Sequence, residues 1–215
     1  MQKKVAYDHL IIDFDGTLFD SHKAVQESML NTLKYFSYNP NKEHINLLIQ
    51  KGLSLSDMLF QLTSNSDLKE MSHYYLEIHK KDIITHGKWY PHALTFLDKI
   101  SDLYHVWIVS NRQQVTLDAV CDHYQIKSPD RILGSKPQQP IKPTKEPFYS
   151  MLDQSLASSS IRRLVIGDTH IDLQFAKELH CDAGWVDHGY GEYDQTWHPI
   201  QFKWKNLYEA SEDLI

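Results

Sequence analysis

The sequence contains little cysteine, no long apolar run and no excess of positive charge. Its two cysteines, Cys121 and Cys181, are too few for a disulfide framework, so we expect a reducing, cytoplasmic setting. The net charge of −6 argues against a nucleic-acid partner, because nucleic-acid-binding surfaces are rich in Lys and Arg. A helix that spans a bilayer needs roughly 20 apolar residues. The sequence has no such run, and we expect no membrane partner either.

The amino-terminal segment also lacks the pattern of a secretory signal. Lys3 and Lys4 are followed by one short apolar run, Leu10–Ile12, which Asp13 interrupts. The chain has 215 residues, of which 41% are hydrophobic. That is enough for one medium-sized α/β core and a smaller insertion.

Short apolar runs alternate with segments of helical periodicity over most of the chain. Strands are predicted near His9–Asp13, His105–Val109, Arg131–Leu133, Leu164–Gly167 and Gly184–Val186, with a further short one near Ile200–Lys203. Helical spacing occurs at Ala93, Phe96, Leu97 and Ile100 after Pro91, at Val115, Ala119 and Val120, and at Leu173, Ala176 and Leu179, and a last helix is expected near Asn206–Leu214. This alternation predicts an α/β fold with a Rossmann-like, three-layer core built on a parallel sheet.

The strand pattern stops between the first and second predicted strands. Four helices are expected there, from apolar residues at Val25, Met29, Leu33 and Phe36, at Ile45, Leu48 and Ile49, at Met58, Leu59 and Leu62, and at Leu68, Met71, Tyr75 and Ile78. We expect them to form a small helical-bundle cap over residues 19–87, inserted into a core domain of residues 1–18 and 88–215. The two connections, Phe19–Asp20 and Gly87–Tyr90, are the expected hinges.

The segment Asp13–Ser21, with the sequence DFDGTLFDS, carries the strongest signal for chemistry. Asp13 and Asp15 alternate along an extended chain at the carboxyl end of a buried strand, so both can face one site while Phe14 faces the core. Gly16 permits a sharp turn, and Thr17 supplies a hydroxyl. A solvated acidic turn is the other explanation, and the remaining motifs decide against it.

Three further motifs follow in a fixed order. They are Ser110-Asn111 after the second strand, Lys142-Pro143 before a helix-like segment around Phe148, Met151 and Leu152, and Gly167-Asp168-Thr169 after a later strand, with Asp172 four residues beyond Asp168. Carboxylates gathered at one sheet edge repel each other by about 4 kcal/mol at 4 Å near a protein surface. A cation is therefore expected among them, and oxygen-only ligands favour Mg²⁺ over zinc.

Together, the four motifs resemble those of the haloacid dehalogenase-like hydrolase superfamily, and most closely its phosphoglycolate phosphatase-like branch with a helical cap. Tyr90-Pro91 and the ending Val186–Gly191 are also similar to that branch, although His92 stands where many relatives have glycine. The resemblance implies a Mg²⁺-dependent phosphatase that hydrolyses small-molecule phosphate monoesters through an aspartyl-phosphate. The expected partner is a small phosphorylated metabolite, and the expected assembly is a monomer or a small homo-oligomer.

The resemblance also implies a role for each motif residue. Asp13 would be the nucleophile, and Asp15 the general acid and base. Ser110 and the backbone N–H of Asn111 would bind the phosphate. Side-chain oxygens of Asp13 and Asp168, together with the backbone carbonyl of Asp15, would hold the Mg²⁺ ion.

Some assignments keep alternatives. Lys142 fits the lysine of the family pattern best, Lys145 is the alternative, and Lys136 lies in the same loop. Asp172 is a metal ligand, an acid that hydrogen-bonds a ligand, or the partner of the lysine. Lys51 and Ser54 lie where related caps contact the leaving group, but they suit an exposed helix end equally well. The 13 histidines show no spacing typical of a metal site, which indicates solvated or hydrogen-bonded side chains.

Two other functions stay open. A phosphomutase of the same superfamily would also have the cap and both aspartates. A receiver-like signalling domain would also combine an acceptor aspartate, a Ser or Thr, a Lys and Mg²⁺. That domain would carry its aspartate on a later strand and would have no cap, so the position of Asp13 on the first strand argues against it.

Overall fold

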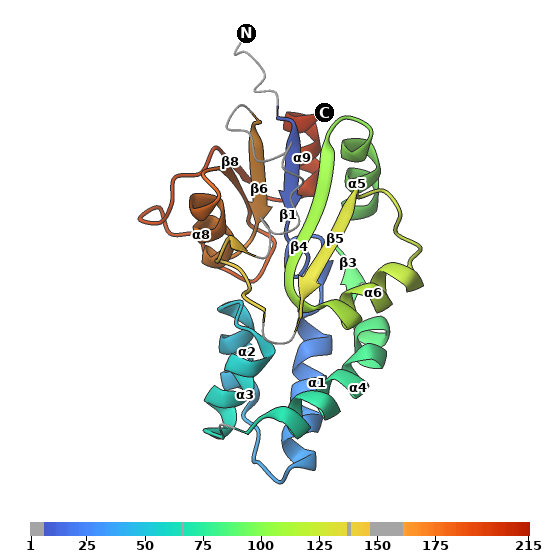
Figure 1. Cartoon of the computed structure of the whole chain (residues 1–215), viewed down its shortest axis with the longest axis vertical. Coiled ribbons are helices and arrows are strands. Elements are labelled where there is room, and N and C mark those ends of the chain that lie inside the picture. The colour runs from blue at the N-terminus through green and yellow to red at the C-terminus, as the bar shows by residue number, and fades with distance from the viewer. Residues whose placement is uncertain (1–6, 66, 137–138, 147–160) are drawn as a thin grey trace.

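The computed structural model describes residues 7–65, 67–136, 139–146 and 161–215. Its main sheet has six strands in the order β5-β4-β1-β6-β7-β8 (Figure 1). These strands are β1 (His9–Ile12), β4 (His105–Gln113), β5 (Arg131–Ser135), β6 (Arg163–Gly167), β7 (Asp182–Val186) and β8 (Phe202–Trp204). Every neighbouring pair is parallel. The α/β class and the parallel sheet predicted from the sequence are confirmed.

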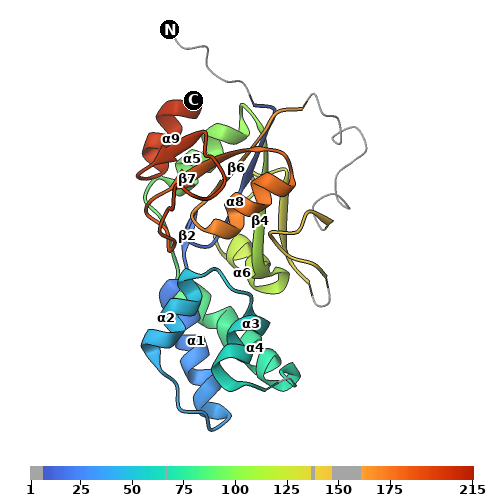
Figure 2. The same ribbon diagram turned by 90° about the vertical axis from the view of Figure 1, so that its left-hand side faces the viewer.

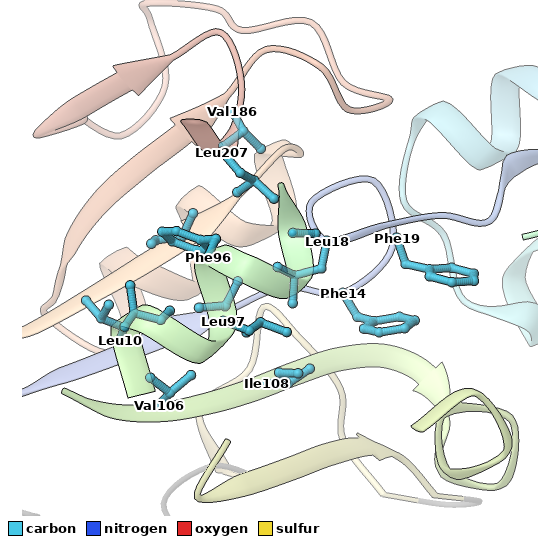
Figure 3. Packing of buried hydrophobic residues seen from close by; sticks show 14 of the residues in the cluster. Leu10, Phe14, Leu18, Phe19, Phe96, Leu97, Val106, Ile108, Val186 and Leu207 are labelled. Carbon is cyan, nitrogen blue, oxygen red and sulfur yellow. The ribbon is translucent and has the colours of Figure 1, made fainter. Parts of the chain in front are cut away.

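Helices cover both faces of this sheet and give the fold its three layers. α5 (Ala93–Ser101), α6 (Gln114–His123) and α9 (Leu207–Leu214) pack into the apolar cluster on one face, and α8 (His170–Glu178) packs into the cluster on the other (Figures 1 and 2). Figure 3 shows part of the first cluster, in which Leu10 of β1, Val106 of β4 and Leu97 of α5 pack together.

β1 is the central strand and is covered on both faces. Leu10 and Ile12 belong to the cluster that includes α5, whereas Ile11 belongs to the cluster that includes α8. Two covered faces require apolar residues at every position, which explains the uninterrupted apolar run of this strand. Phe14 continues the side of Leu10 and Ile12, because it joins their cluster. Asp13 is thereby left on the side of Ile11.

The four helices predicted after the first strand are present. They are α1 (His22–Tyr35), α2 (Lys42–Gln50), α3 (Leu55–Thr63) and α4 (Lys69–His86). They surround an apolar cluster of their own, which includes Met29, Leu33, Ile45, Leu59 and Tyr75. We call this unit the helical bundle. In both ribbon views it lies beyond the carboxyl ends of the strands, at the opposite end of the molecule from α9 (Figures 1 and 2).

The two connections to the helical bundle pair with each other, which the sequence did not reveal. β2 (Phe19–Asp20) and β3 (Lys88–Trp89) form an antiparallel ribbon in which Phe19 is opposite Trp89 and Asp20 is opposite Lys88. The rings of Phe19 and Trp89 meet edge to face with centroids 5.3 Å apart. The predicted hinge segments are therefore one paired element.

The structure differs from the sequence prediction at the end of β4 and on the buried face of α6. β4 extends to Gln113, past the predicted end at Val109. The buried face of α6 carries Leu117 and Val120, whereas Val115 is 44% exposed. At about 100° per residue, Val115 lies roughly opposite the face that contacts the sheet, so the predicted apolar stripe of Val115, Ala119 and Val120 is not the buried face of α6. The helix-like segment expected around 148–152 lies outside the described residues.

Among the described helices, none combines the length and the apolar character that a membrane span requires.

His92, directly before α5, has a left-handed backbone with φ of 68°. Glycine adopts this conformation freely, whereas a residue with a Cβ does so at a cost of roughly 1–2 kcal/mol. A glycine here would relieve this strain, which gives a conformational reason for the glycine expected from the family resemblance.

The two faces of α6 provide a matched test of the core. Val120→Ala should lower the free energy of unfolding by about 2 kcal/mol, because Val120 is fully buried. Val115→Ala, on the exposed face of the same helix, should change it by less than about 0.5 kcal/mol. Urea unfolding followed by circular dichroism measures both. Equal losses in the two variants would contradict the observed orientation of α6.

Candidate active site

Parallel pairing brings two aspartates together at the carboxyl edge of the sheet. Ile12 of β1 is in register with Ile166 of β6, and each strand is followed within two residues by an aspartate. Asp13 is anchored there by its backbone N–H, which donates to the carbonyl of Ile166 at 2.9 Å. Asp13 and Asp168 are thus placed by the sheet itself rather than by a flexible loop.

Gly16 allows the chain to turn tightly against Asp168. Its φ is 87°, in the left-handed region that favours glycine. A Cβ at this position would lie 2.2 Å from the carboxylate oxygen Oδ2 of Asp168, closer than atoms can approach. Glycine is required here both for the backbone conformation and for the space that the carboxylate fills.

Asp13, Asp168 and Asp172 form one buried carboxylate cluster, with an oxygen from each lying within 4.8 Å of the others. Burial, opposed by Lys142 but reinforced by the other two carboxylates, raises the pKa of Asp13 well above its ordinary range. Burial and the charge of Asp172 raise the pKa of Asp168 to about 7. Buried carboxylates at this spacing fit a divalent cation with oxygen ligands. These three residues could therefore hold a metal ion.

Lys142 is the cation that the protein itself supplies to this cluster. Its Nζ lies 2.5 Å from Asp13 and 2.7 Å from Asp172, and the side chain is buried. Burial lowers the pKa of Lys142, but the two carboxylates outweigh that effect and raise it. Lys136 and Lys145 are exposed. Of the three lysines that the sequence left open, the structure places Lys142 at the cluster.

Asn111 holds the loop that carries this lysine. Its side-chain amide donates to the carbonyl of Lys142 at 3.1 Å, and its side-chain oxygen accepts from the N–H of Lys142 at 2.9 Å. Asn111 also lines the cavity described below. Its side chain has the additional task of fixing Lys142.

Hydrogen-bond donors from neighbouring residues contact the carboxylates of Asp168 and Asp172. The hydroxyl of Thr17 and the backbone N–H of Tyr190 donate to Asp168 at 2.8 and 2.7 Å. Asp172 accepts from the N–H and the hydroxyl of Thr169 at the start of α8, at 3.1 and 2.7 Å. Asp172 therefore pairs with the lysine, caps a helix and lies within the carboxylate cluster.

Asp15 belongs to a second polar group, adjacent to the first. Its carboxylate accepts from the hydroxyl of Ser21 at 2.5 Å and from that of Ser110 at 3.3 Å. The guanidinium of Arg112 binds the same carboxylate through Nε at 2.9 Å and Nη2 at 2.5 Å. Ser110 is thus beside Asp15, and Arg112 is a cation that the sequence interpretation missed.

Arg112 also joins the core to the helical bundle. Its Nη1 donates to Nε2 of His79 at 2.7 Å, and Nδ1 of His79 is 2.8 Å from the hydroxyl of Ser28. That hydroxyl donates to Asp82 at 2.8 Å. Burial, reinforced by Arg112, lowers the pKa of His79 well below its ordinary value. His79 is therefore a neutral acceptor for the arginine.

The sequence itself carries signals for two of these site residues, Arg112 and Tyr190. Arg112 follows Ser110 by two positions, so in an extended strand both side chains point to one side. Tyr190 lies between two glycines in a segment that already resembled the family, and its hydroxyl accepts from the N–H of Ser21 at 2.7 Å. His79 carried no signal, because its contact depends on how the bundle meets the core.

A cavity of about 120 Å³ opens above both polar groups. Asp13, Asp15, Lys142 and Asp172 line the side formed by the core. The side formed by the helical bundle is lined mainly by apolar side chains, namely Val25, Ile49, Leu53, Leu55, Met58 and Leu76. Lys51 and Ser54 are absent from the lining, and Ser54 instead caps α3 by accepting from the N–H of Asp57. Ser54 is therefore a helix cap in this structure, and Lys51 is exposed.

Several proteins of known structure share the fold of this chain. A haloacid dehalogenase-like family hydrolase from Streptococcus pneumoniae superposes with a TM-score of 0.80 and 22% identity, over 95% of this chain and 96% of that one. A provisionally assigned phosphoglycolate phosphatase from Lactobacillus plantarum superposes with a TM-score of 0.84 and 16% identity, over 97% of this chain and 100% of that one. A similarly assigned protein from Haemophilus somnus gives 0.75 and 16%, over 96% and 97%.

At these identities the structures establish a shared fold. No curated protein matches the chain significantly in sequence. The sequence profile of the haloacid dehalogenase-like hydrolases, however, matches residues 10–186, which is most of the chain and includes Asp13, Asp15, Ser110, Lys142 and Asp168. This chain belongs to the haloacid dehalogenase-like hydrolase family.

Proposed function

We propose that this hydrolase is a Mg²⁺-dependent phosphatase that cleaves small phosphate monoesters through an aspartyl-phosphate on Asp13. One observation carries the proposal. Asp13 lies beside Lys142 and the other carboxylates on the floor of the cavity, and Asp15 lies in the same cavity two residues further on. A nucleophile, a proton carrier and positive charge are the groups that phosphoryl transfer requires.

In the first step, a carboxylate oxygen of Asp13 forms a bond to phosphorus, and the bond between phosphorus and the ester oxygen breaks. Asp15 gives its proton to that oxygen, so the alcohol leaves neutral. In the second step Asp15 takes a proton from water, whose oxygen bonds to phosphorus and releases phosphate and Asp13. The ion pair with Arg112 orients Asp15 and suits the second step, in which the ionised carboxylate accepts a proton. For the first step Asp15 takes up a proton from solvent before it gives that proton to the ester oxygen. Lys142 and the hydroxyl of Ser110 bind phosphate oxygens.

Asp13, Asp168 and the backbone carbonyl of Asp15 would hold Mg²⁺, with Asp172 beside them. The ion, when bound, supplies positive charge that offsets the carboxylates and the phosphate. The buried cluster fits this role because three carboxylates face the single ammonium group of Lys142. The hydrogen bonds to Asp168 from Thr17 and Tyr190 fix its orientation within the cluster.

We further propose that residues 19–87 act as a cap domain over a core of residues 1–18 and 88–215. The bundle lines one side of the cavity and hydrogen-bonds the core through His79 and Arg112. A cap at this place excludes bulk water during transfer and limits the substrate to small molecules. The paired ribbon of β2 and β3 is the proposed hinge.

Substitution of the two aspartates tests the chemistry. Asp13→Asn should abolish Mg²⁺-dependent phosphate release, because the amide has the same shape but is a poor nucleophile. Asp15→Asn should slow release by roughly 10²–10⁴-fold, the usual contribution of positioned acid–base catalysis. Phosphate assays on a panel of small esters provide the measurement. Wild-type rates in Asp13→Asn would remove the proposed nucleophile, and isomerisation of a hexose phosphate with little free phosphate would indicate a mutase.

The lysines provide a test with a built-in control. Lys142→Ala should reduce phosphate release at least as strongly as Asp15→Asn, because it removes the cation that contacts Asp13. Lys145→Ala, three residues away and exposed, should leave the rate within about twofold of wild type. Circular dichroism confirms that both variants fold. Loss of activity in Lys145→Ala alone would contradict the assignment of Lys142.

The raised pKa of Asp168 predicts how stability depends on pH without metal. Its carboxyl has a pKa of about 7 in the folded protein, against roughly 3.9 in an unfolded chain, so folding favours the protonated form. The stabilisation is complete below about pH 4 and is lost as pH rises through about 7. Urea unfolding in EDTA from pH 5 to 8 should show this loss.

Binding of Mg²⁺ should restore the folding stability that is lost at high pH. At a concentration of about 100 times its dissociation constant, the ion should add about 2.7 kcal/mol at pH 8. Asp168→Asn should remove both the gain and much of the pH dependence, whereas Asp102→Asn, exposed on the core, should alter neither. Full stabilisation of Asp168→Asn by Mg²⁺ would argue against Asp168 as a ligand.

A further inference from the structure

The cavity has two chemically different sides. The core contributes carboxylates, Lys142, Arg112 and hydroxyl or amide groups. The helical bundle contributes six apolar side chains from all four of its helices and the connection between α2 and α3, namely Val25, Ile49, Leu53, Leu55, Met58 and Leu76. In the proposed reaction the phosphate binds on the core side, so the alcohol that leaves faces the bundle.

We call these six side chains the apolar wall. Almost all polar groups near the apolar wall already have a hydrogen-bond or ion-pair partner. Both ring nitrogens of His79 have partners, in Arg112 and Ser28. The three nitrogens of the Arg112 guanidinium are bound to Asp15 and His79. Ser21 is bound to Asp15. Among the described residues that line the cavity, the hydroxyl of Tyr75 and the side-chain amide of Gln113 are the polar groups without such a partner.

This wall discriminates between alcohols. A sugar or polyol presents a hydroxyl on nearly every carbon, and most of these would lose water without gaining a hydrogen-bond partner. Each hydroxyl buried in this way lowers the affinity by roughly tenfold. An aliphatic or aromatic group instead gains from burial against the six side chains.

We propose that the substrates of this enzyme are phosphate monoesters of small apolar alcohols, in preference to sugar or polyol phosphates. This inference rests on the proposed phosphatase activity and adds the chemical class of the leaving group. The specificity residues are the apolar ones on the bundle side, and Met58 is central to the test because it is only 6% exposed and lines the cavity.

The decisive comparison uses two esters of equal carbon number, propyl phosphate and glycerol 3-phosphate. They differ by two hydroxyls, so the purified full-length protein with Mg²⁺ should show kcat/KM at least about tenfold higher for propyl phosphate. Glycerol is the slightly better leaving group chemically, so intrinsic reactivity cannot produce this preference. Equal or faster turnover of glycerol 3-phosphate would overturn the inference and leave the phosphatase proposal intact. Phosphate release from neither ester nor any other small monoester would overturn the phosphatase proposal itself.

A pair of variants tests whether the apolar wall causes the preference for propyl phosphate. Met58→Gln keeps the length of the side chain but adds an amide, and it should reduce the ratio of the two kcat/KM values at least about fivefold. Phe60→Gln, on the same helix but 54% exposed and outside the cavity lining, should leave the ratio unchanged. Leu76→Gln on α4 repeats the test if Met58→Gln does not fold. An unchanged ratio in a folded wall variant would overturn the assignment.

Discussion

Within the part of the chain that the structure describes, three carboxylates are buried at one edge of the sheet and share one lysine, Lys142. Most neighbouring contacts of the site offset this excess of negative charge. Lys142 bridges two of the carboxylates, and Thr17, Thr169 and the N–H of Tyr190 supply hydrogen bonds to them. Gly16 gives Asp168 room. Such a cluster is costly in a folded protein because like charges repel more strongly in a low-dielectric interior. Its retention makes sense as a place prepared for added positive charge.

A second ion pair, between Asp15 and Arg112, lies where the core meets the helical bundle. Asp15 follows the end of β1 and Arg112 lies on the neighbouring strand β4, yet Arg112 also reaches His79 on α4. The charge needed for chemistry is thereby kept on the core side, and the helical bundle adds one neutral acceptor to it. The rest of the bundle's contribution to the cavity is almost entirely apolar. In the proposed function, reaction chemistry and recognition of the leaving group therefore belong to different structural units.

The fold and the position of the site could be predicted because both depend on short-range patterns. A strand covered on both faces needs an apolar run, and parallel strands bring their carboxyl ends together, which is why Asp13 and Asp168 were expected to meet. Arg112 was missed because the predicted strand stopped at Val109, so its alternation with Ser110 was not followed. The choice among three lysines depended on the path of a loop that Asn111 fixes, and the contact of His79 depended on the docking of two units. Neither has a local signature in the sequence.

The ribbon of β2 and β3 has an evolutionary consequence. Phe19 is opposite Trp89, so the chain leaves the core and returns to it at adjacent positions. For the sheet, everything between Asp20 and Lys88 is therefore equivalent to the tip of a hairpin. A longer, shorter or unrelated segment could replace it without shifting the register of β1 or the start of α5. A lineage could therefore exchange the unit that we propose selects the alcohol while inheriting the carboxylates of the core unchanged.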